Sequence, residues 1–131
     1  MSTFNAIGVA GTGVTVYRKW LDAVSDNIAN VDNVSRTSEN AFQARYVVAQ
    51  EAQDGNGAQV GGIAYGSAEG RLSFEPDNPL ADTEGYVRRP DIDLGSQMAQ
   101  MIMAQRAYQA NLSVVDRARD SYQAAINLGK A

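Results

Sequence analysis

Two serines are the side chains that could act as nucleophiles in this sequence. Ser113 and Ser121 lie near the carboxyl end, but the 131-residue chain contains no histidine and no cysteine. A serine nucleophile needs an adjacent base, most often histidine, and an ordinary zinc site needs histidine or cysteine ligands. A small hydrolase that uses either serine as its nucleophile is an alternative function, but the chain has no histidine to act as the base. The sequence predicts a protein that is not an enzyme and has no catalytic residue and no metal site.

Carboxylates gather in segment 75–85, where they could bind calcium. Glu75, Asp77, Asp82 and Glu84 all lie in this segment. However, Pro79 falls where an EF-hand loop would place a ligand, and the spacing of the carboxylates does not match that loop. A solvated turn explains the segment better.

Three glycines near the amino end, Gly8, Gly11 and Gly13, could suggest a phosphate loop. Such a loop follows a strand and ends in Gly-Lys-Ser/Thr, and the sequence has neither feature. The glycines lie instead inside a helical pattern, where each costs about 1 kcal/mol relative to alanine. We expect these turns to become ordered when a partner packs against them.

The composition excludes further classes of function. The chain has 11 Lys and Arg and 15 Asp and Glu, and its basic residues are scattered rather than clustered as in a nucleic-acid-binding protein. We expect no nucleic acid, no small-molecule substrate and no cofactor. No run reaches 18 consecutive apolar residues, and no basic segment precedes an apolar core at the amino end. Neither a membrane span nor a cleaved signal peptide is therefore expected.

A long helix over residues 94–130 is the main element that the sequence predicts. Its apolar residues recur every three or four positions, and at about 1.5 Å per residue it would be about 55 Å long. Asp91 or Asp93 can cap it. Over 94–115 its only ionisable side chain is Arg106, and charge depletion is typical of a surface that contacts another protein. Burial inside its own domain is the alternative. The stripe consists of Leu94, Met98, Met101, Tyr108, Leu112, Val115, Tyr122 and Ile126.

A second helix is predicted at the amino end. It begins near Phe4, with Ser2 or Thr3 as its cap, and ends in a turn between Asn30 and Asn33. Its apolar residues alternate steps of three and four: Ile7, Ala10, Val14, Tyr17, Leu21, Val24, Ile28 and Val31.

Between the helices, short apolar and β-branched runs separated by glycine predict a small β-rich insert. The expected strands are 42–49, 59–65, 71–74 and 86–89. We therefore predict an α+β fold with two long terminal helices packed as an antiparallel coiled-coil-like pair. The chain divides into 1–33, the first half of the helical domain; 34–92, the connection and insert; and 93–131, the second half.

Four motifs give the chain a family resemblance. They are Asn-Ile-Ala-Asn at 27–30, Asp-Asn-Pro-Leu-Ala-Asp at 77–82, Gly-Tyr-Val-Arg-Arg-Pro-Asp-Ile-Asp-Leu at 85–94, and Met-Ile-Met-Ala-Gln-Arg-Ala-Tyr-Gln-Ala-Asn at 101–111. Over nearly its whole length the chain resembles the bacterial flagellar basal-body rod proteins, and within that family the C-type proximal branch. The motif residues that we single out are Ala29, Asn30, Gly85, Tyr86, Pro90, Asp91, Asp93, Tyr108 and Asn111.

The resemblance implies a structural subunit of the proximal rod, which assembles helically into a hollow, torque-transmitting shaft and export channel. It implies export without signal cleavage through the flagellar type III apparatus, and a final place in the basal body, in the periplasm. The implied partners are copies of the chain and other rod proteins, with the membrane-ring adaptor and the export apparatus as further partners. A secreted type III coiled-coil adaptor or effector is the alternative function.

The candidate functional sites are therefore contact surfaces on the two terminal helices. The predicted contact residues are Ile7, Val14, Tyr17, Leu21, Val24 and Ile28 in the first helix and Met98, Met101, Tyr108, Leu112, Val115 and Tyr122 in the second. Asn30 and Asn111 are expected to hydrogen-bond to the backbone at packed junctions.

We predict that the purified monomer at low concentration contains much less helix than these patterns imply, because the glycine-rich first turns have no partner to pack against. Far-UV circular dichroism measures the helix content. A fully helical monomer would rule out the idea that assembly orders the terminal turns.

Overall fold

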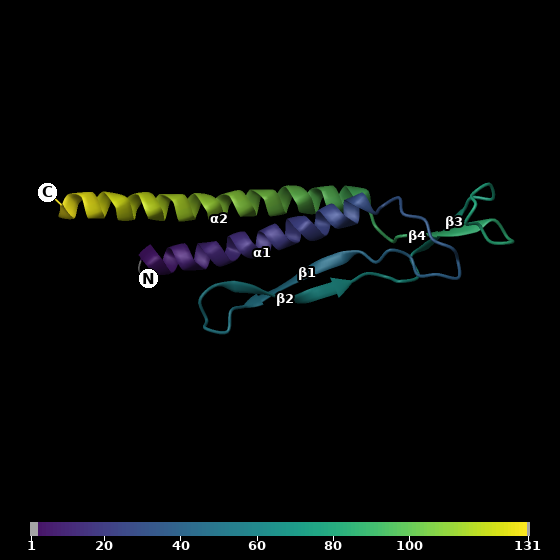
Figure 1. The fold of residues 1–131 in the computed structure, drawn as a ribbon, viewed down its shortest axis with the longest axis horizontal. Helices are drawn as coiled ribbons and strands as arrows, with labels where there is room; N and C mark the ends of the chain where they lie inside the picture. Colours follow the sequence, from purple (N-terminus) through teal and green to yellow (C-terminus); the bar gives the residue numbers. More distant parts are fainter. Residues whose placement is uncertain (1–2, 131) are drawn as a thin grey trace.

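The computed structural model describes residues 3–130 and forms an elongated, layered molecule (Figure 1). Helix α1 lies between helix α2 on one side and a two-stranded hairpin on the other. A second hairpin extends beyond the end of the helix pair. In chain order the elements are α1 (Thr3–Ala29), β1 (Arg45–Glu51), β2 (Ala58–Tyr65), β3 (Arg71–Phe74), β4 (Tyr86–Arg89) and α2 (Leu94–Gly129).

The predicted α+β fold, with its pair of long helices and its small hairpins, is confirmed. The boundaries of α2 and the turn after α1 agree with the sequence analysis. Asp93 is the N-cap of α2, because its carboxylate accepts a hydrogen bond from the Ser96 N–H at 2.6 Å. The proposed cap at Ser2 lies outside the described residues. The division into three regions stays a prediction.

The two helices run antiparallel. At one end of their contact, Asn27 Nδ2 donates to Gln97 Oε1 at 3.0 Å. At the other end, Phe4 and Tyr122 pack edge to face with their ring centroids 4.7 Å apart. Because Tyr122 lies against the beginning of α1, the last turns of α2 extend beyond the helix pair (Figure 1).

Gly13 of α1 lies directly beside Asn111 of α2. A Cβ atom at this position would lie 2.7 Å from Asn111 Oδ1, inside van der Waals contact, whereas Gly8 and Gly11 have open space at the same point. Of the three glycines near the amino end, Gly13 is therefore the one whose missing side chain allows α1 and α2 to approach.

Both hairpins are antiparallel and two-stranded. In the first, Arg45 pairs with Tyr65 and Glu51 with Ala58, with a bulge after Val48. In the second, the register runs from Arg71 opposite Arg89 to Phe74 opposite Tyr86. The strands predicted at 59–65, 71–74 and 86–89 agree with β2, β3 and β4 to within one residue. The first strand begins three residues later than predicted, at Arg45, where the chain meets the side chain of Asn27.

The Asn27 side chain joins three elements. Its Nδ2 donates to the Arg45 carbonyl at 2.9 Å and to Gln97, while its Oδ1 accepts from the Arg45 N–H at 2.8 Å. Asn27 is fully buried. The amide therefore pairs with the first residue of β1 as a neighbouring strand would, and it links α1 to both adjacent layers.

The interior is built from small side chains. The buried hydrophobic residues are Ala10, Val16, Ala23, Val24, Ala41, Ala44, Val87, Ile92 and Ala104. No Leu, Met, Phe, Tyr or Trp within residues 3–130 falls in the buried class. Over the same residues, no helix is long and apolar enough to cross a membrane.

We predict that Asn27→Leu lowers the free energy of unfolding by about 3 kcal/mol, because it leaves the Arg45 backbone N–H and carbonyl and the buried Gln97 amide without these partners, at about 1–3 kcal/mol each. Urea denaturation followed by Trp20 fluorescence measures the change. Asn30→Ala is the matched control. Its side chain donates to the Asp26 carbonyl at an exposed position, so we expect a loss below about 1 kcal/mol. Equal losses in both variants would contradict the role of Asn27 as a link between layers.

Candidate assembly interface

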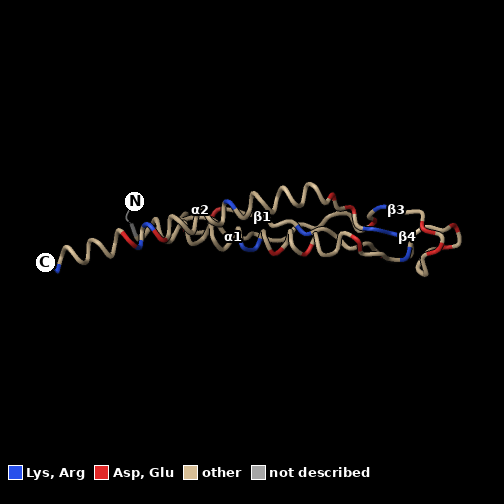
Figure 2. The backbone as a smooth tube through the Cα atoms, turned by 90° about the horizontal axis from the view of Figure 1, so that it is seen from above, with Lys and Arg blue, Asp and Glu red and all other residues tan. Residues whose placement is uncertain are grey.

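Exposed apolar side chains occur along much of α2, on more than one side of the helix. Met98, Ile102 and Met103 are each more than half exposed, and Leu112 and Val114 lie farther along the same helix with 40% and 47% exposure. Over 94–115 the only charged side chain is Arg106, and long uncharged stretches of both helices are visible in Figure 2. Large exposed apolar surfaces of this kind are typical of protein–protein contact sites.

The predicted contact residues lie at different depths. Val24 is buried, and Ile7, Val14, Tyr17, Leu21 and Ile28 are half-buried in α1. In α2, Met101, Tyr108 and Val115 are half-buried, whereas Met98, Leu112 and Tyr122 are exposed. Exposure alone does not separate residues within the helix pair from residues on the outside, because the exposed Tyr122 packs against Phe4 of α1. Their role in contacts between subunits stays a prediction.

The central line of the helix pair does not follow the predicted apolar stripes. It consists of residues spaced seven positions apart, Gly13, Trp20 and Asn27 in α1 and Gln97, Ala104 and Asn111 in α2, of which the sequence analysis singled out Asn111 for its backbone bond. The predicted α1 stripe of Val14, Leu21 and Ile28 lies one residue later, which is about a quarter turn around the helix. The repeated seven-residue spacing of small and polar residues was the available signal.

Two motif asparagines bond to the backbone, as predicted, but the Asn30 bond lies at an exposed position and not at a packed junction. Asn30 Nδ2 donates to the Asp26 carbonyl, and Asn111 Nδ2 donates to the Ala107 carbonyl, both at 2.8 Å. Ala29 is the last residue of α1. At Asn111 the internal bond holds the amide in place beside Gly13 of α1.

The motif at 85–94 builds the junction between the second hairpin and α2. Gly85 has a φ of +87°, a left-handed conformation that favours glycine, and Tyr86 follows it as the first residue of β4. Asp82 Oδ1 accepts from the Tyr86 N–H at 2.9 Å and from the Glu84 N–H at 3.0 Å. These backbone donors, Tyr86 first among them, lower the pKa of the Asp82 carboxyl. The carboxylate thus fixes the turn.

The two arginines of this motif tie the hairpin to the rest of the chain. Arg88 donates to the carbonyls of Thr37 at 2.7 Å and Glu69 at 2.9 Å, and its backbone exchanges two 2.9 Å hydrogen bonds with Ser35. Arg89 Nε lies 2.6 Å from Glu75 Oε1. Between this pair and α2, Pro90 is fully buried and Asp91 is exposed.

The first hairpin is fastened to α1 at two points with an open groove between them. Asn27 holds one end at Arg45, and Thr12 Oγ1 holds the other by accepting from the Ala58 N–H at 3.1 Å. The groove between α1 and the hairpin has a volume of about 230 Å³. Its lining is mainly apolar and consists of Gly13, Val16, Tyr17, Trp20, Val47, Ala49 and Ala58.

The serines that could have been nucleophiles are engaged with their own helix. Ser113 Oγ donates to the Gln109 carbonyl and Ser121 Oγ to the Arg117 carbonyl, both at 2.9 Å. Among the described residues, no group of acidic side chains is arranged to hold a metal ion. What the arrangement offers chemically is surface for packing against other proteins.

Comparison with known proteins agrees with this geometry. A family model described as the flagellar basal body rod FlgEFG protein C-terminal region matches residues 83–128. The flagellar basal-body rod protein FlgC of Yersinia enterocolitica is 35% identical, with 99% of this chain and 100% of that protein aligned. The chain belongs to the FlgC family of flagellar basal-body rod proteins.

Other FlgC proteins align over the same extent. That of Salmonella typhimurium is 31% identical and that of Bacillus subtilis 25% identical, each with 99% of this chain and 100% of the relative aligned. The chain is therefore a structural subunit of the flagellar basal-body rod and not an enzyme. The motifs at 85–94 and 101–111, which suggested the resemblance, both lie inside the matched segment.

The pH dependence of unfolding tests how much the Glu75–Arg89 pair stabilises the hairpin junction of this FlgC-family chain. The Arg89 hydrogen bond, followed by that of Asn78, lowers the pKa of Glu75 from 4.5 to about 2. A carboxyl whose pKa is lower in the folded state stabilises the fold above its unfolded pKa, so this contribution is lost as the pH falls from about 4.5 to about 2. We expect Glu75→Gln to lower the thermal unfolding midpoint near neutral pH and to match the wild-type chain at about pH 2.

Circular dichroism at a series of pH values gives both midpoints. Asp77→Asn is the control, since it removes an exposed carboxylate of the same segment, and its midpoint should follow that of the wild-type chain. A difference between Glu75→Gln and wild type that persists unchanged to the lowest pH would contradict the proposed role of the Glu75–Arg89 pair.

Proposed function

We propose that this chain forms part of the proximal rod, a hollow helical shaft that transmits torque and encloses an export channel. In this proposal the outward surface of α2 packs against copies of the chain and against other rod proteins. The observation that carries the proposal is the set of exposed apolar side chains of α2 from Met98 to Val114, a stretch with Arg106 as its single charge, on a chain of the rod protein family.

The shape of the chain supports a role as a mechanical subunit. Torque passing through a shaft is best borne by many packing contacts spread along each subunit. The elongated helix pair offers such contacts along its length (Figure 1). Contacts between different surfaces of identical or related subunits, when they do not close into a ring, generate a helical stack.

We also propose that the chain is exported through the flagellar type III apparatus without signal cleavage and assembles in the periplasm. Two features support this route. Most of the buried apolar side chains are alanine and valine, so little packing has to be undone to extend the chain. The sequence contains no cysteine, so no disulfide bond restricts it. The membrane-ring adaptor and the export apparatus are further proposed partners.

Leu112→Asp tests the proposed interface. Leu112 is 40% exposed on α2, so the monomer can accommodate a charge there. In a contact between subunits, however, the carboxylate would lose its water without gaining a partner, which is energetically costly. We expect the variant to be expressed normally and to abolish swimming in soft agar in a strain that lacks its own copy of the gene. Immunoblots of whole cells and of basal bodies separate loss of expression from loss of assembly.

Asn40→Asp is the matched control for this experiment. It adds the same negative charge at an exposed position in the connection after α1, and motility should be retained. A motile Leu112→Asp strain whose basal bodies contain the variant would count decisively against the interface.

A further inference from the structure

We propose that Asn56 is a site of intrinsic chemical modification, at which the chain deamidates itself and thereby releases the loop of the first hairpin from α1. The modification takes place in the isolated chain, so it goes beyond the proposed function and does not require assembly. Three features carry it: the residue that follows Asn56, the hydrogen bonds of the loop between β1 and β2, and the contact of this loop with Thr12.

Asn56 is the only asparagine in the sequence that is followed by glycine. In such a pair the backbone nitrogen of the glycine can attack the side-chain carbonyl carbon of the asparagine, because glycine has no Cβ atom to obstruct the approach. The Gly57 nitrogen loses its proton and bonds to Asn56 Cγ, the Cγ–Nδ2 bond breaks, and Nδ2 leaves as ammonia. Water then opens the resulting succinimide ring to give aspartate or isoaspartate. The net reaction is hydrolysis of an amide, without oxidation or reduction.

The loop leaves the reacting atoms accessible. Asn56 is exposed, and within residues 3–130 the Gly57 N–H donates no hydrogen bond. Its proton is therefore open to removal by water or hydroxide. The leaving nitrogen, Asn56 Nδ2, donates to the Asp54 carbonyl at 3.2 Å, at an exposed position and at the long end of the usual range. Water competes with an exposed bond of this length, so the side chain is free to turn toward Gly57.

The other asparagines lack this combination. Asn78 precedes Pro79, whose nitrogen carries no proton. Asn27 is fully buried, and its amide makes the hydrogen bonds to β1 and α2. The remaining asparagines precede alanine, valine or leucine, whose Cβ atoms hinder the attack. The sequence and the fold together direct the reaction to Asn56.

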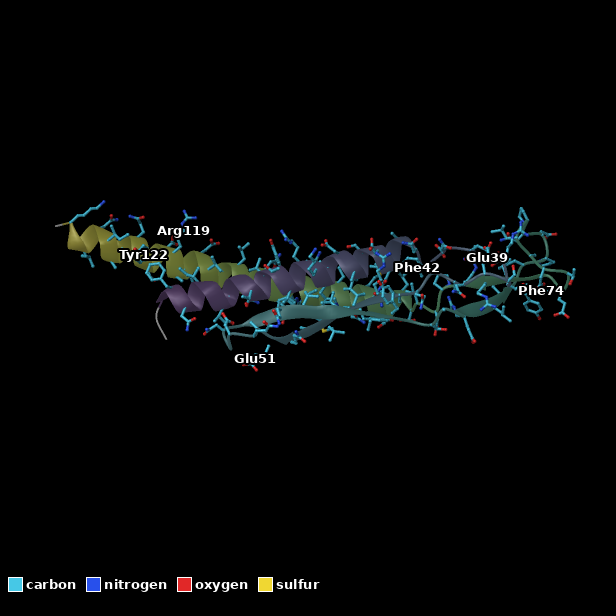
Figure 3. The ribbon with its side chains drawn as sticks, turned by 60° about the horizontal axis from the view of Figure 1, so that its bottom comes forward. Glu39, Phe42, Glu51, Phe74, Arg119 and Tyr122 are labelled. Carbon is cyan, nitrogen blue, oxygen red and sulfur yellow. The ribbon has the colours of Figure 1, made fainter. Side chains whose placement is uncertain are left out.

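The loop has no slack against α1. Gly57 has a φ of +102°, which favours glycine, and a Cβ atom there would lie 3.2 Å from Thr12 Cβ and closer still to Thr12 Oγ1. The next residue, Ala58, donates its N–H to Thr12 Oγ1, and the Gly57 carbonyl accepts from the Ala52 N–H at 3.0 Å to close the loop. Figure 3 shows Glu51, the last residue of β1, at this end of the hairpin, beside the amino-terminal half of α1.

Isoaspartate at position 56 disturbs this arrangement in two ways. It adds one carbon to the backbone immediately before Gly57, and it places a new carboxylate two residues after Asp54. Because Gly57 has no room to shift toward Thr12, the lengthened loop moves away from α1 and the bond between Ala58 and Thr12 is lost. Of the two points that fasten the hairpin to α1, only Asn27 then remains, and the groove that Ala58 lines opens at this end.

Ageing of the full-length chain tests the site. The protein is kept in mildly alkaline buffer at physiological temperature and digested with trypsin, which releases residues 46–71 with Asn56 as their only asparagine. Mass spectrometry follows the increase in mass as the amide becomes a carboxyl, and an isoaspartate-specific methyltransferase identifies the product. We expect this peptide to be modified before any other peptide that contains asparagine. A peptide that stays unmodified in the folded chain overturns the site, whether or not the urea-unfolded chain is modified there.

Two glutamine variants make the assignment specific. Asn56→Gln should abolish the increase in mass of this peptide, because the longer side chain must close a larger and less favourable ring. Asn40→Gln is the matched control, since Asn40 is exposed in the connection after α1 and its replacement should leave the modification of Asn56 unaltered. An increase that persists in Asn56→Gln overturns the assignment, because the reaction would then lie at a glutamine of the same peptide.

Amide hydrogen exchange tests the release of the loop. In the aged chain the protection of the Ala58 N–H should fall about tenfold, as expected for one lost hydrogen bond, whereas that of the Arg45 N–H, bonded to Asn27, should be retained. Freshly prepared Asn56→Asp carries the new charge on a backbone of normal length and should keep Ala58 protected. Unchanged protection in chains that contain isoaspartate, or an equal loss in Asn56→Asp, overturns release through the lengthened backbone.

Discussion

The buried amide of Asn27 is the interaction on which the layered arrangement depends. Its three hydrogen bonds reach β1 and α2 from the middle layer, so a single side chain fixes the positions of both neighbours. Inside a protein such bonds are strong, and any one left unmade is costly. These bonds also fix the register of the first hairpin. The backbone N–H and carbonyl of Arg45 bond to the Asn27 side chain in place of a third strand. Gln97 in turn anchors the beginning of α2.

The distribution of large side chains is the reverse of that in an ordinary monomeric domain. Leu, Met and Phe are usually among the most buried residues. Here alanine and valine fill the interior, and the larger apolar residues lie on α2, on the hairpins and at the two ends. Small residues at the centre let the layers approach closely, as Gly13 does beside Asn111. The large residues remain available for burial against neighbours, which is what a subunit of a continuous shaft requires.

The sequence predicts the elements of this fold better than their contacts. The boundaries of α2, the cap at Asp93 and the short strands could be predicted because periodicity and capping act within a few residues. The contact between Asn27 and Gln97 could not, since it joins residues 70 positions apart through amides that carry no hydrophobic signal. The close approach at Gly13 was missed in the same way. Hydrophobic periodicity identified apolar stripes on both helices, but steric fit at small residues sets which face lies at the centre.

The pairing of the two chain ends determines when the fold can form. Every contact between α1 and α2 closes a loop that contains the whole insert, and the pair of Phe4 and Tyr122 spans almost the entire chain. Proteins dominated by such distant contacts fold slowly, because the entropy of closing the loop is lost before the contacts form. During synthesis the chain lacks α2 until the whole insert has been made. The helix pair can therefore form only after both hairpins have been synthesised.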